Sequence, residues 1–193
     1  MTQSCNQLIK EIVKGNEAAM ELLVKSNYNM VHSFVYRSVG DYNISYDLTQ
    51  EIFIKMMKNI NKYDYKNGNF THWILKIASN HYKDYFRSAA YKQRINNKDI
   101  DGEEIYADGT VVDILEKNES RKAVKKAVDN LPTLQREAII LKYYNNLKIK
   151  EISEVTGFNE STIKSRLFSG IGNLRKIMGG GKCEEKHRIS KYL

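Results

Sequence analysis

Pro132 is the only proline in a chain of 193 residues. Proline breaks the interior of a helix, so its scarcity leaves nearly the whole chain free to be helical. Apolar residues recur at spacings of three and four along most of the sequence, which is the period of an amphipathic α-helix. The sequence therefore predicts an all-α fold.

The periodic segments mark the expected helices, which are separated by breaks rich in Gly and Asn. Gly40–Ser45 is predicted to be a turn, and 63–69 is predicted to be a loop that carries two aromatic residues. The expected helices cover residues 8–13, 18–39, 47–62, 70–91, 120–130, 133–144, 149–156 and 162–176.

The helical period fails between Arg94 and Glu116, where acidic residues and two glycines dominate. Such a stretch lacks the apolar residues needed to join a core and is typical of a linker. We therefore expect two small helical domains joined by a flexible linker. The predicted boundaries are 1–92 for the first domain, 93–118 for the acidic linker, 119–178 for the second domain and 179–193 for a polar tail.

The net charge favours a polyanionic partner. Lys and Arg number 31 and Asp and Glu number 23, which gives a formal charge of +8. Nucleic acid is the first candidate partner and an anionic membrane surface is the second. No apolar run approaches the roughly 20 residues that a membrane-spanning helix needs, and the N-terminus does not resemble a signal peptide. We expect a cytoplasmic protein without membrane insertion.

Cysteine and histidine usage gives no sign of a disulfide framework or a metal site. The two cysteines, Cys5 and Cys183, lie near opposite ends of the chain. The four histidines are scattered singly, without the short spacings that metal-binding helices use. We expect no metal and no cofactor, and the acids that a metal-dependent nucleic-acid enzyme would cluster lie mostly in the linker.

The last two predicted helices form a helix-turn-helix pattern, because a short break containing Gly157 joins them. In this motif the second helix enters the major groove of DNA, and neighbouring cations contact phosphates. The expected phosphate contacts are Lys148, Lys150, Arg166, Arg175 and Lys176. The alternative is a helical hairpin that only packs.

The N-terminal half interleaves aromatic and basic residues. Rings stack on exposed bases and cations follow the backbone, which suits single-stranded or melted nucleic acid. The rings are Tyr63, Tyr65, Phe70, Trp73, Tyr82, Tyr85 and Phe86, and the cations are Lys62, Lys66, Lys76, Lys83 and Arg87. Alternatively most of the rings belong to the core, as we expect for Trp73 and Tyr85.

Two gapped motifs in this order resemble the sigma-70 family, and specifically its small two-domain extracytoplasmic-function (ECF) group. Asp47-Leu48-Thr49-Gln50-Glu51-Ile52-Phe53 resembles the family's D-L-x-Q-E-x-F helix, and Phe70 to Arg87 resembles its F-x-x-W-L…I-A-x-N…D-x-x-R segment. Leu131-Pro132 and the run Ser161-Thr162-Ile163-Lys164-Ser165-Arg166-Leu167 resemble the family's helix-turn-helix domain. The resemblance covers residues 6 to 176.

The resemblance implies a non-enzymatic promoter-specificity subunit of bacterial RNA polymerase. Its expected partners are core RNA polymerase, promoter DNA in duplex and melted form, and an anti-sigma factor. By position, the polymerase would contact Asp47, Leu48, Gln50, Glu51 and Phe53. The minus-ten element would contact Lys66, Asn67, Gly68, Asn69, His72, Lys76, Asn80, Lys83 and Arg87. The minus-thirty-five element would contact Glu160, Ser161, Thr162, Lys164, Ser165, Arg166, Phe168 and Ser169.

The chain departs from the family pattern at a few positions. Ile44 stands where the family often carries an acid, and Asn146 and Lys148 replace a common Gly and Ser. Gly170 and Gly172 replace an Arg-Ala-Arg-type continuation, and a glycine inside a helix costs roughly 1 kcal/mol. The remaining alternative is an ordinary helix-turn-helix regulator, which would leave the N-terminal motifs without an explanation.

Overall fold

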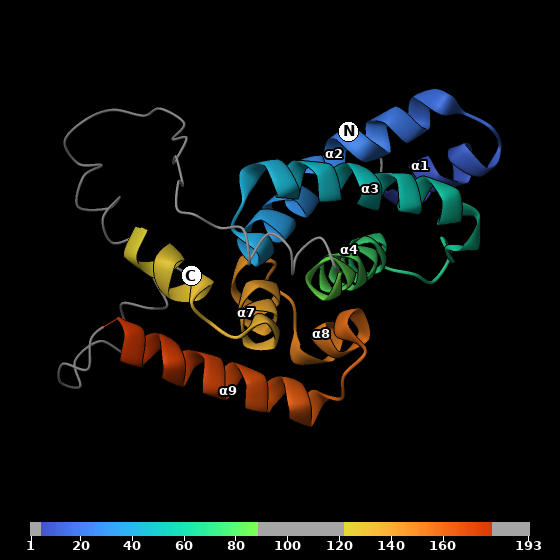
Figure 1. Cartoon of the computed structure of the whole chain (residues 1–193). Helices are drawn as coiled ribbons and strands as arrows, with labels where there is room; N and C mark the ends of the chain where they lie inside the picture. Colours follow the sequence, from blue (N-terminus) through green and yellow to red (C-terminus); the bar gives the residue numbers. More distant parts are fainter. Residues whose placement is uncertain (1–4, 89–121, 179–193) are drawn as a thin grey trace, which may run out of the picture.

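The computed structural model describes residues 5–88 and 122–178, and these residues form helices and connecting turns, which confirms the all-α prediction. The predicted linker and tail lie outside the described residues. The helices are α1 (Cys5–Val13), α2 (Glu17–Val39), α3 (Tyr42–Asn59), α4 (Phe70–Arg87), α7 (Thr133–Ile139), α8 (Ile149–Thr156) and α9 (Glu160–Ile177), with a 3₁₀ turn η1 (Ile60–Lys62), a π-helical turn η2 (Ile140–Tyr144) and a helical stretch over 122–129 (Figure 1).

Asparagine and aspartate side chains set most of the helix starts. Asn16, Asp41, Asn69 and Asn159 each accept a hydrogen bond from the backbone N–H three residues later, at the position where a helix has unpaired donors. The predicted turn over Gly40–Ser45 is too long, because Asp41 already caps α3 and the helix begins at Tyr42. The turn itself is short and rests on Gly40, whose φ is +80°.

The N-terminal core joins α1, α2, α3 and α4, with fully buried Ile9, Leu23, Ile52 and Ile74 from the four helices. An aromatic cluster joins the residue after η1 to the start of α4, where the centroid of the Tyr63 ring lies 5.8 Å from that of Phe70 and 5.1 Å from that of Trp73. Tyr82 is fully buried, and Tyr65, Tyr85 and Phe86 pack against the core. Most of the aromatic residues that the sequence offered for stacking on bases therefore belong to the core or pack against it, and they stabilise the fold.

The C-terminal half packs α7 closely against α9. A Cβ on Gly170 would lie only 3.2 Å from the Ile139 Cγ1 atom, so the absence of a side chain lets the two helices approach. The close contact between α7 and α9 explains why this position is a glycine, although the family pattern has a larger residue in this segment. Asn146 adopts a left-handed conformation with φ of +56°, as does Gly157 with φ of +77°, and each ends a helical segment.

The two halves pack against one another. α4 lies against α8, and α2 lies against η2 and α7 (Figure 1). The Arg37 guanidinium stacks 4.3 Å from the centre of the Tyr144 ring. Arg136 donates to the carbonyl of Ser38 at 2.8 Å and also to the carbonyls of Asp129 and Leu131, so one side chain joins α2 to the end of the 122–129 helix.

Candidate nucleic-acid interface

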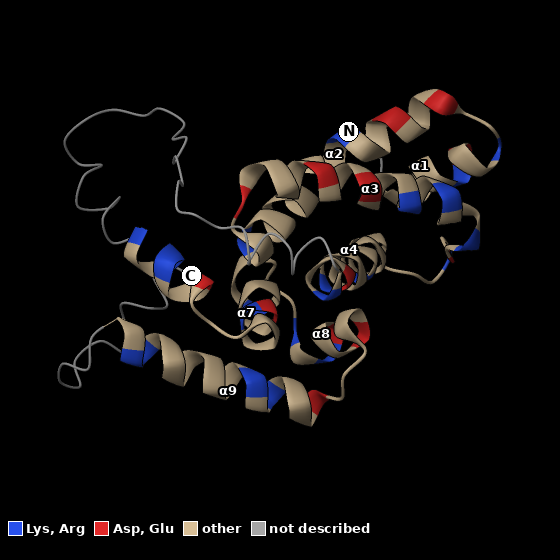
Figure 2. Cartoon of the chain, in the orientation of Figure 1, with Lys and Arg blue, Asp and Glu red and all other residues tan. Residues whose placement is uncertain are grey.

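The second helix of the helix-turn-helix, α9, turns one face to solvent. Phe168 is 82% exposed, which is unusual for a large apolar side chain, and Lys164 and Ser165 are exposed one turn before it. Glu160, Ser161 and Ser169 are also exposed, and Thr162 is half-buried. Figure 2 shows Lys and Arg along α9. This face can approach base edges without moving any core residue.

Arg166 differs from the other predicted base-reading residues. Its guanidinium lies 3.7 Å from the centre of the Phe158 ring, on the side of α9 that faces the rest of the protein. The Lys83 ammonium of α4 lies 5.5 Å from the same ring. A cation over a ring face is attracted by the ring quadrupole, so Arg166 stabilises the C-terminal half from within, whereas Lys83 contributes to the contact between the halves.

The loop before α4 presents a compact polar surface. The carboxylate of Asp64 accepts hydrogen bonds from the Asn67 side chain and from the N–H groups of Lys66 and Asn67, which lowers the pKa of Asp64. A Cβ on Gly68 would lie 2.4 Å from the Asp64 carbonyl oxygen, so only glycine fits there. Lys66, Asn67 and Asn69 are exposed around this turn.

The polar face of α4 divides into two parts. Lys76, Asn80 and Arg87 are exposed, as expected for a nucleic-acid contact. His72 and Lys83 instead face the C-terminal half, and their side chains are only 16% and 11% exposed. The family resemblance assigned all five to the minus-ten contact, and the sequence held no signal that the C-terminal half would cover two of them.

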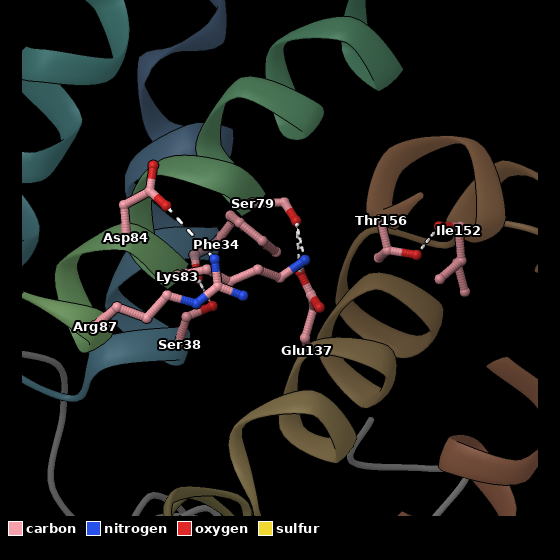
Figure 3. Close-up of polar contacts among 9 residues, drawn as sticks. All are labelled: Phe34, Ser38, Ser79, Lys83, Asp84, Arg87, Glu137, Ile152 and Thr156. Carbon is pink, nitrogen blue, oxygen red and sulfur yellow. Dashed lines mark hydrogen bonds and ion pairs between the residues drawn. The ribbon is translucent and has the colours of Figure 1, made fainter. Parts of the chain in front are cut away.

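The partners of the covered side chains are acidic. The His72 ring nitrogens lie 3.9 Å from Glu151 and 3.8 Å from Glu154, both on α8. The Lys83 ammonium lies 3.0 Å from the Glu137 carboxylate on α7 (Figure 3). The C-terminal half thus places carboxylates against the basic side chains of α4.

The exposed face of α3 is mixed polar and apolar. Asp47, Gln50 and Glu51 are exposed, whereas Leu48 and Phe53 are buried in the core at 6% and 3% exposure. The apolar part of the surface comes from Ile54 and Met57, which are 44% and 40% exposed. Sequence reasoning missed these two, although they continue the helical stripe that begins at Asp47 and Gln50.

Glu51 belongs to a chain of titratable groups. The His81 Nδ1 atom lies 2.6 Å from the Lys55 ammonium, and Nε2 lies 2.7 Å from the Glu51 carboxylate. An ammonium can only donate, so Nδ1 accepts and Nε2 carries the proton. Burial lowers the pKa of His81, and Lys55 lowers it further, so the ring is held neutral.

Other kinds of site find no support in the residues that the structure describes. Within 5–88 and 122–178, no group of three His, Cys, Asp or Glu side chains is placed to hold a metal ion. None of the helices in the same ranges combines the length and the apolar character needed to cross a membrane.

The helix-turn-helix and the polar surface beside it define a DNA-binding protein of helix-turn-helix type. A family model described as "Sigma-70 region 2" matches residues 23–91, and one described as "Sigma-70, region 4" matches 121–172. The chain is 29% identical over 174 residues to the ECF RNA polymerase sigma factor SigK of Mycobacterium ulcerans, covering 90% of this chain and 92% of the relative. The chain belongs to the sigma-70 family, in its ECF group.

A second relative and two solved structures agree with this family assignment. The ECF RNA polymerase sigma factor SigW of Bacillus subtilis is 28% identical over 184 residues, which cover 91% of this chain and 97% of that one. The fold resembles the sigma factor RpoE of Bartonella quintana in complex with the anti-sigma factor NepR, with a TM-score of 0.66 and 20% identity over 82% of this chain and 96% of RpoE. It also resembles CnrH in complex with the cytosolic domain of CnrY, with a TM-score of 0.64 and 19% identity over 91% and 97%.

Family membership settles the class of function. The chain is a promoter-recognising transcription initiation factor, and sigma factors are initiation factors rather than classical enzymes. The ordinary regulator that the helix-turn-helix alone left open does not account for the match to region 2.

Proposed function

We propose that this chain binds core RNA polymerase, reads minus-thirty-five and minus-ten promoter elements and promotes DNA melting, without a catalytic step of its own. The observation that carries the proposal is the order of two separate surfaces along one chain, a polar loop and helix in the N-terminal half and a helix-turn-helix in the C-terminal half. Its place of action is the cytoplasm.

The outward face of α9 is proposed to read the duplex. Lys164 and Ser165 offer a cation and a hydroxyl for phosphates and base edges, and the exposed Phe168 ring offers an apolar contact for a thymine methyl group. Glu160, Ser161, Thr162 and Ser169 border this face. Arg166 joins it only when its stacking contact with Phe158 is released.

The loop at 64–69 and the exposed part of α4 are proposed to contact the minus-ten element. The amides of Asn67 and Asn80 can bond to base edges, and Lys66, Lys76 and Arg87 can contact phosphates. In the aromatic cluster beside the loop, Tyr63 and Phe70 are buried and Trp73 is half-buried, so we propose that the cluster holds the loop in shape.

The exposed face of α3 is proposed to bind core polymerase. Asp47, Gln50 and Glu51 supply the polar contacts, and Ile54 and Met57 supply the apolar contacts. A surface with an apolar centre and a polar rim suits a helix-on-helix interface. Leu48 and Phe53 support this face from beneath, because they anchor α3 in the core.

An anti-sigma factor is a further proposed partner. The solved structures of RpoE and CnrH are complexes with NepR and with the cytosolic domain of CnrY, respectively. The similarity of the fold supports a partner of this kind for this chain.

Reconstitution with purified core polymerase tests the proposal. We expect co-elution in size exclusion and specific initiation on a promoter. The pair Ile54→Ala and Met57→Ala should weaken core binding about tenfold or more, because buried apolar contacts dominate such interfaces. Leu22→Ala is the matched control, because this leucine is 53% exposed on α2. Binding to duplex DNA without any binding to core polymerase would instead favour the ordinary regulator.

A further inference from the structure

A carboxylate from one half of the protein is buried among donors from the other half. The Glu137 side chain on α7 is fully buried, and its Oε1 atom accepts a 2.5 Å hydrogen bond from the Ser79 hydroxyl on α4. The Lys83 ammonium lies 3.0 Å from the same carboxylate and donates to the Ser79 oxygen at 2.9 Å. Figure 3 shows the three side chains converging between the helices.

Ser79 and Lys83 therefore form a small anion site on α4. A hydroxyl and an ammonium one helical turn apart converge on a single anionic oxygen. Phosphate oxygens accept hydrogen bonds from the same donors, and serine and lysine are common phosphate contacts in nucleic-acid complexes. The geometry that holds the carboxylate oxygen also suits a phosphate oxygen.

The position of this site on α4 points to the nature of the ligand. Lys76, Asn80, Lys83 and Arg87 follow one another at helical spacing and form a single stripe. Three of the four are exposed, and only Lys83 is covered. A backbone of nucleic acid that follows this stripe would pass directly over Ser79 and Lys83, where the C-terminal half places Glu137 instead.

We propose that Ser79 and Lys83 bind a phosphate of promoter DNA, and that Glu137 occupies their site as an internal substitute while the two halves are packed together. This inference rests on the proposed function, since it needs α4 to contact DNA. Separation of the halves removes Glu137 and exposes the site, so the packed arrangement binds DNA more weakly than the open one.

The test measures binding of the full chain to a short fluorescent single-stranded DNA of mixed sequence, by anisotropy at several salt concentrations. Glu137→Gln keeps the shape and removes the charge. We expect this variant to bind about tenfold more tightly, because a charge-assisted contact is gained. Its salt dependence should steepen by about 0.7, the increment for one further phosphate on a single strand.

Lys83→Met is the decisive partner variant. It leaves Glu137 without its cation and so also loosens the contact between the halves, but it removes half of the proposed site. We expect Lys83→Met alone, and combined with Glu137→Gln, to show neither the gain in affinity nor the steeper salt dependence. A gain in the double variant equal to that in Glu137→Gln would overturn the proposal.

A second route covers the case in which Glu137→Gln does not fold. Arg37→Gln removes the stacking contact with Tyr144 and loosens the halves at a contact that does not include Ser79, Lys83 or Glu137. Its affinity for the DNA should rise, and Lys83→Met should abolish the rise. Unchanged affinity in a variant whose halves have separated, measured by energy transfer between dyes on α3 and α9, contradicts the proposal.

Two further measurements distinguish this inference from binding of an acidic protein partner and from the proposed function itself. A polyglutamate peptide should gain less affinity than DNA in Glu137→Gln, and an equal or larger gain for the peptide would assign the site to an acidic protein partner. Initiation by the unaltered chain with core polymerase tests the proposed function independently. Normal initiation together with no gain in Glu137→Gln defeats only this inference.

Discussion

Gly170 and Gly172 illustrate how neighbouring residues of one type differ in their surroundings. A Cβ on Gly170 would lie 3.2 Å from Ile139 Cγ1 and 3.6 Å from Gln135 Cβ, whereas a Cβ on Gly172 would have no neighbour within 4 Å. Alanine gains roughly 1 kcal/mol over glycine inside a helix when space is available. An additional methyl group in a tightly packed contact lowers the free energy of unfolding by about 1 to 3 kcal/mol.

We therefore expect Gly172→Ala to raise the free energy of unfolding by about 1 kcal/mol. Gly170→Ala should lack this gain and be less stable than Gly172→Ala by about 1 to 3 kcal/mol. Urea unfolding of both variants measures the difference. Equal stabilisation by the two substitutions would show that α7 and α9 do not depend on this close approach.

His81 gives the protein a dependence on pH with a definite sign. Its pKa lies below the usual 6.5, first through burial and then through Lys55, while Glu51 acts in the opposite direction. As the pH falls below 6.5, the unfolded chain takes up the proton before the folded one. The contribution to stability is thus present above that pH and is lost as the pH falls through the folded pKa.

NMR titration of the imidazole resonances tests this arrangement. Lys55→Met should raise the pKa of His81, and Glu51→Gln should lower it, because each removes one of the two opposing charges. His32 is the internal control, since burial alone lowers its pKa and neither variant touches it. Equal shifts at both histidines would indicate a general change in structure rather than the loss of a neighbour.

At the scale of the single helix, two basic residues of α9 that lie only two positions apart have different surroundings. Lys164 points to solvent, and Arg166 stacks on Phe158. Lys164→Ala should weaken binding to duplex promoter DNA and reduce the salt slope by about 0.9, the increment for one duplex phosphate. Arg166→Ala should lower the melting temperature, which Lys164→Ala should leave unchanged.

Anisotropy at several salt concentrations and thermal unfolding by circular dichroism distinguish the two variants. If Arg166→Ala reduces the salt slope as much as Lys164→Ala and leaves the melting temperature unchanged, Arg166 binds DNA in the way the family resemblance implies. The stacking of Arg166 on Phe158 would then belong to the DNA-free protein and be released on binding.

The sequence predicted the helices well because each amphipathic helix carries its own period. The sequence was less informative about which side of each helix is buried and which is exposed. The motif match placed Leu48 and Phe53 on the polymerase-binding surface, whereas both are buried, and it passed over Ile54 and Met57. A motif identifies a helix, but which of its residues are buried depends on the neighbours of that helix, here α2 and α4.

At the scale of the whole molecule, the contact between the halves could not be predicted from the sequence. Ser79 and Glu137 lie 58 positions apart and share no local pattern. Only the packing of α4 against α8, beside the bonds of Ser79 and Lys83 to α7, brings a carboxylate to that position. Asn146 and Gly157 are different, because left-handed residues at helix ends follow from local chemistry.

Fragments of the chain test the predicted domain boundaries. We expect residues 1–92 and residues 119–178 each to fold as a helical unit with its own cooperative thermal transition. Each fragment should be less stable than the full chain, because each loses the contact between the halves, which includes the bonds of Ser79 and Lys83 to Glu137. A non-cooperative transition in either fragment, followed by circular dichroism, would mean that the halves fold only together.

The position of α7 has a mechanical consequence. On one side this helix carries Glu137, which meets α4, and on the other it carries Ile139, which meets Gly170 of α9. Closely packed side chains transmit a displacement from one helix to the next, because the interior is hardly compressible. If DNA displaces Glu137 as proposed, we expect α9 to move together with α7, so that binding at the minus-ten element changes the orientation of the helix proposed to read the minus-thirty-five element.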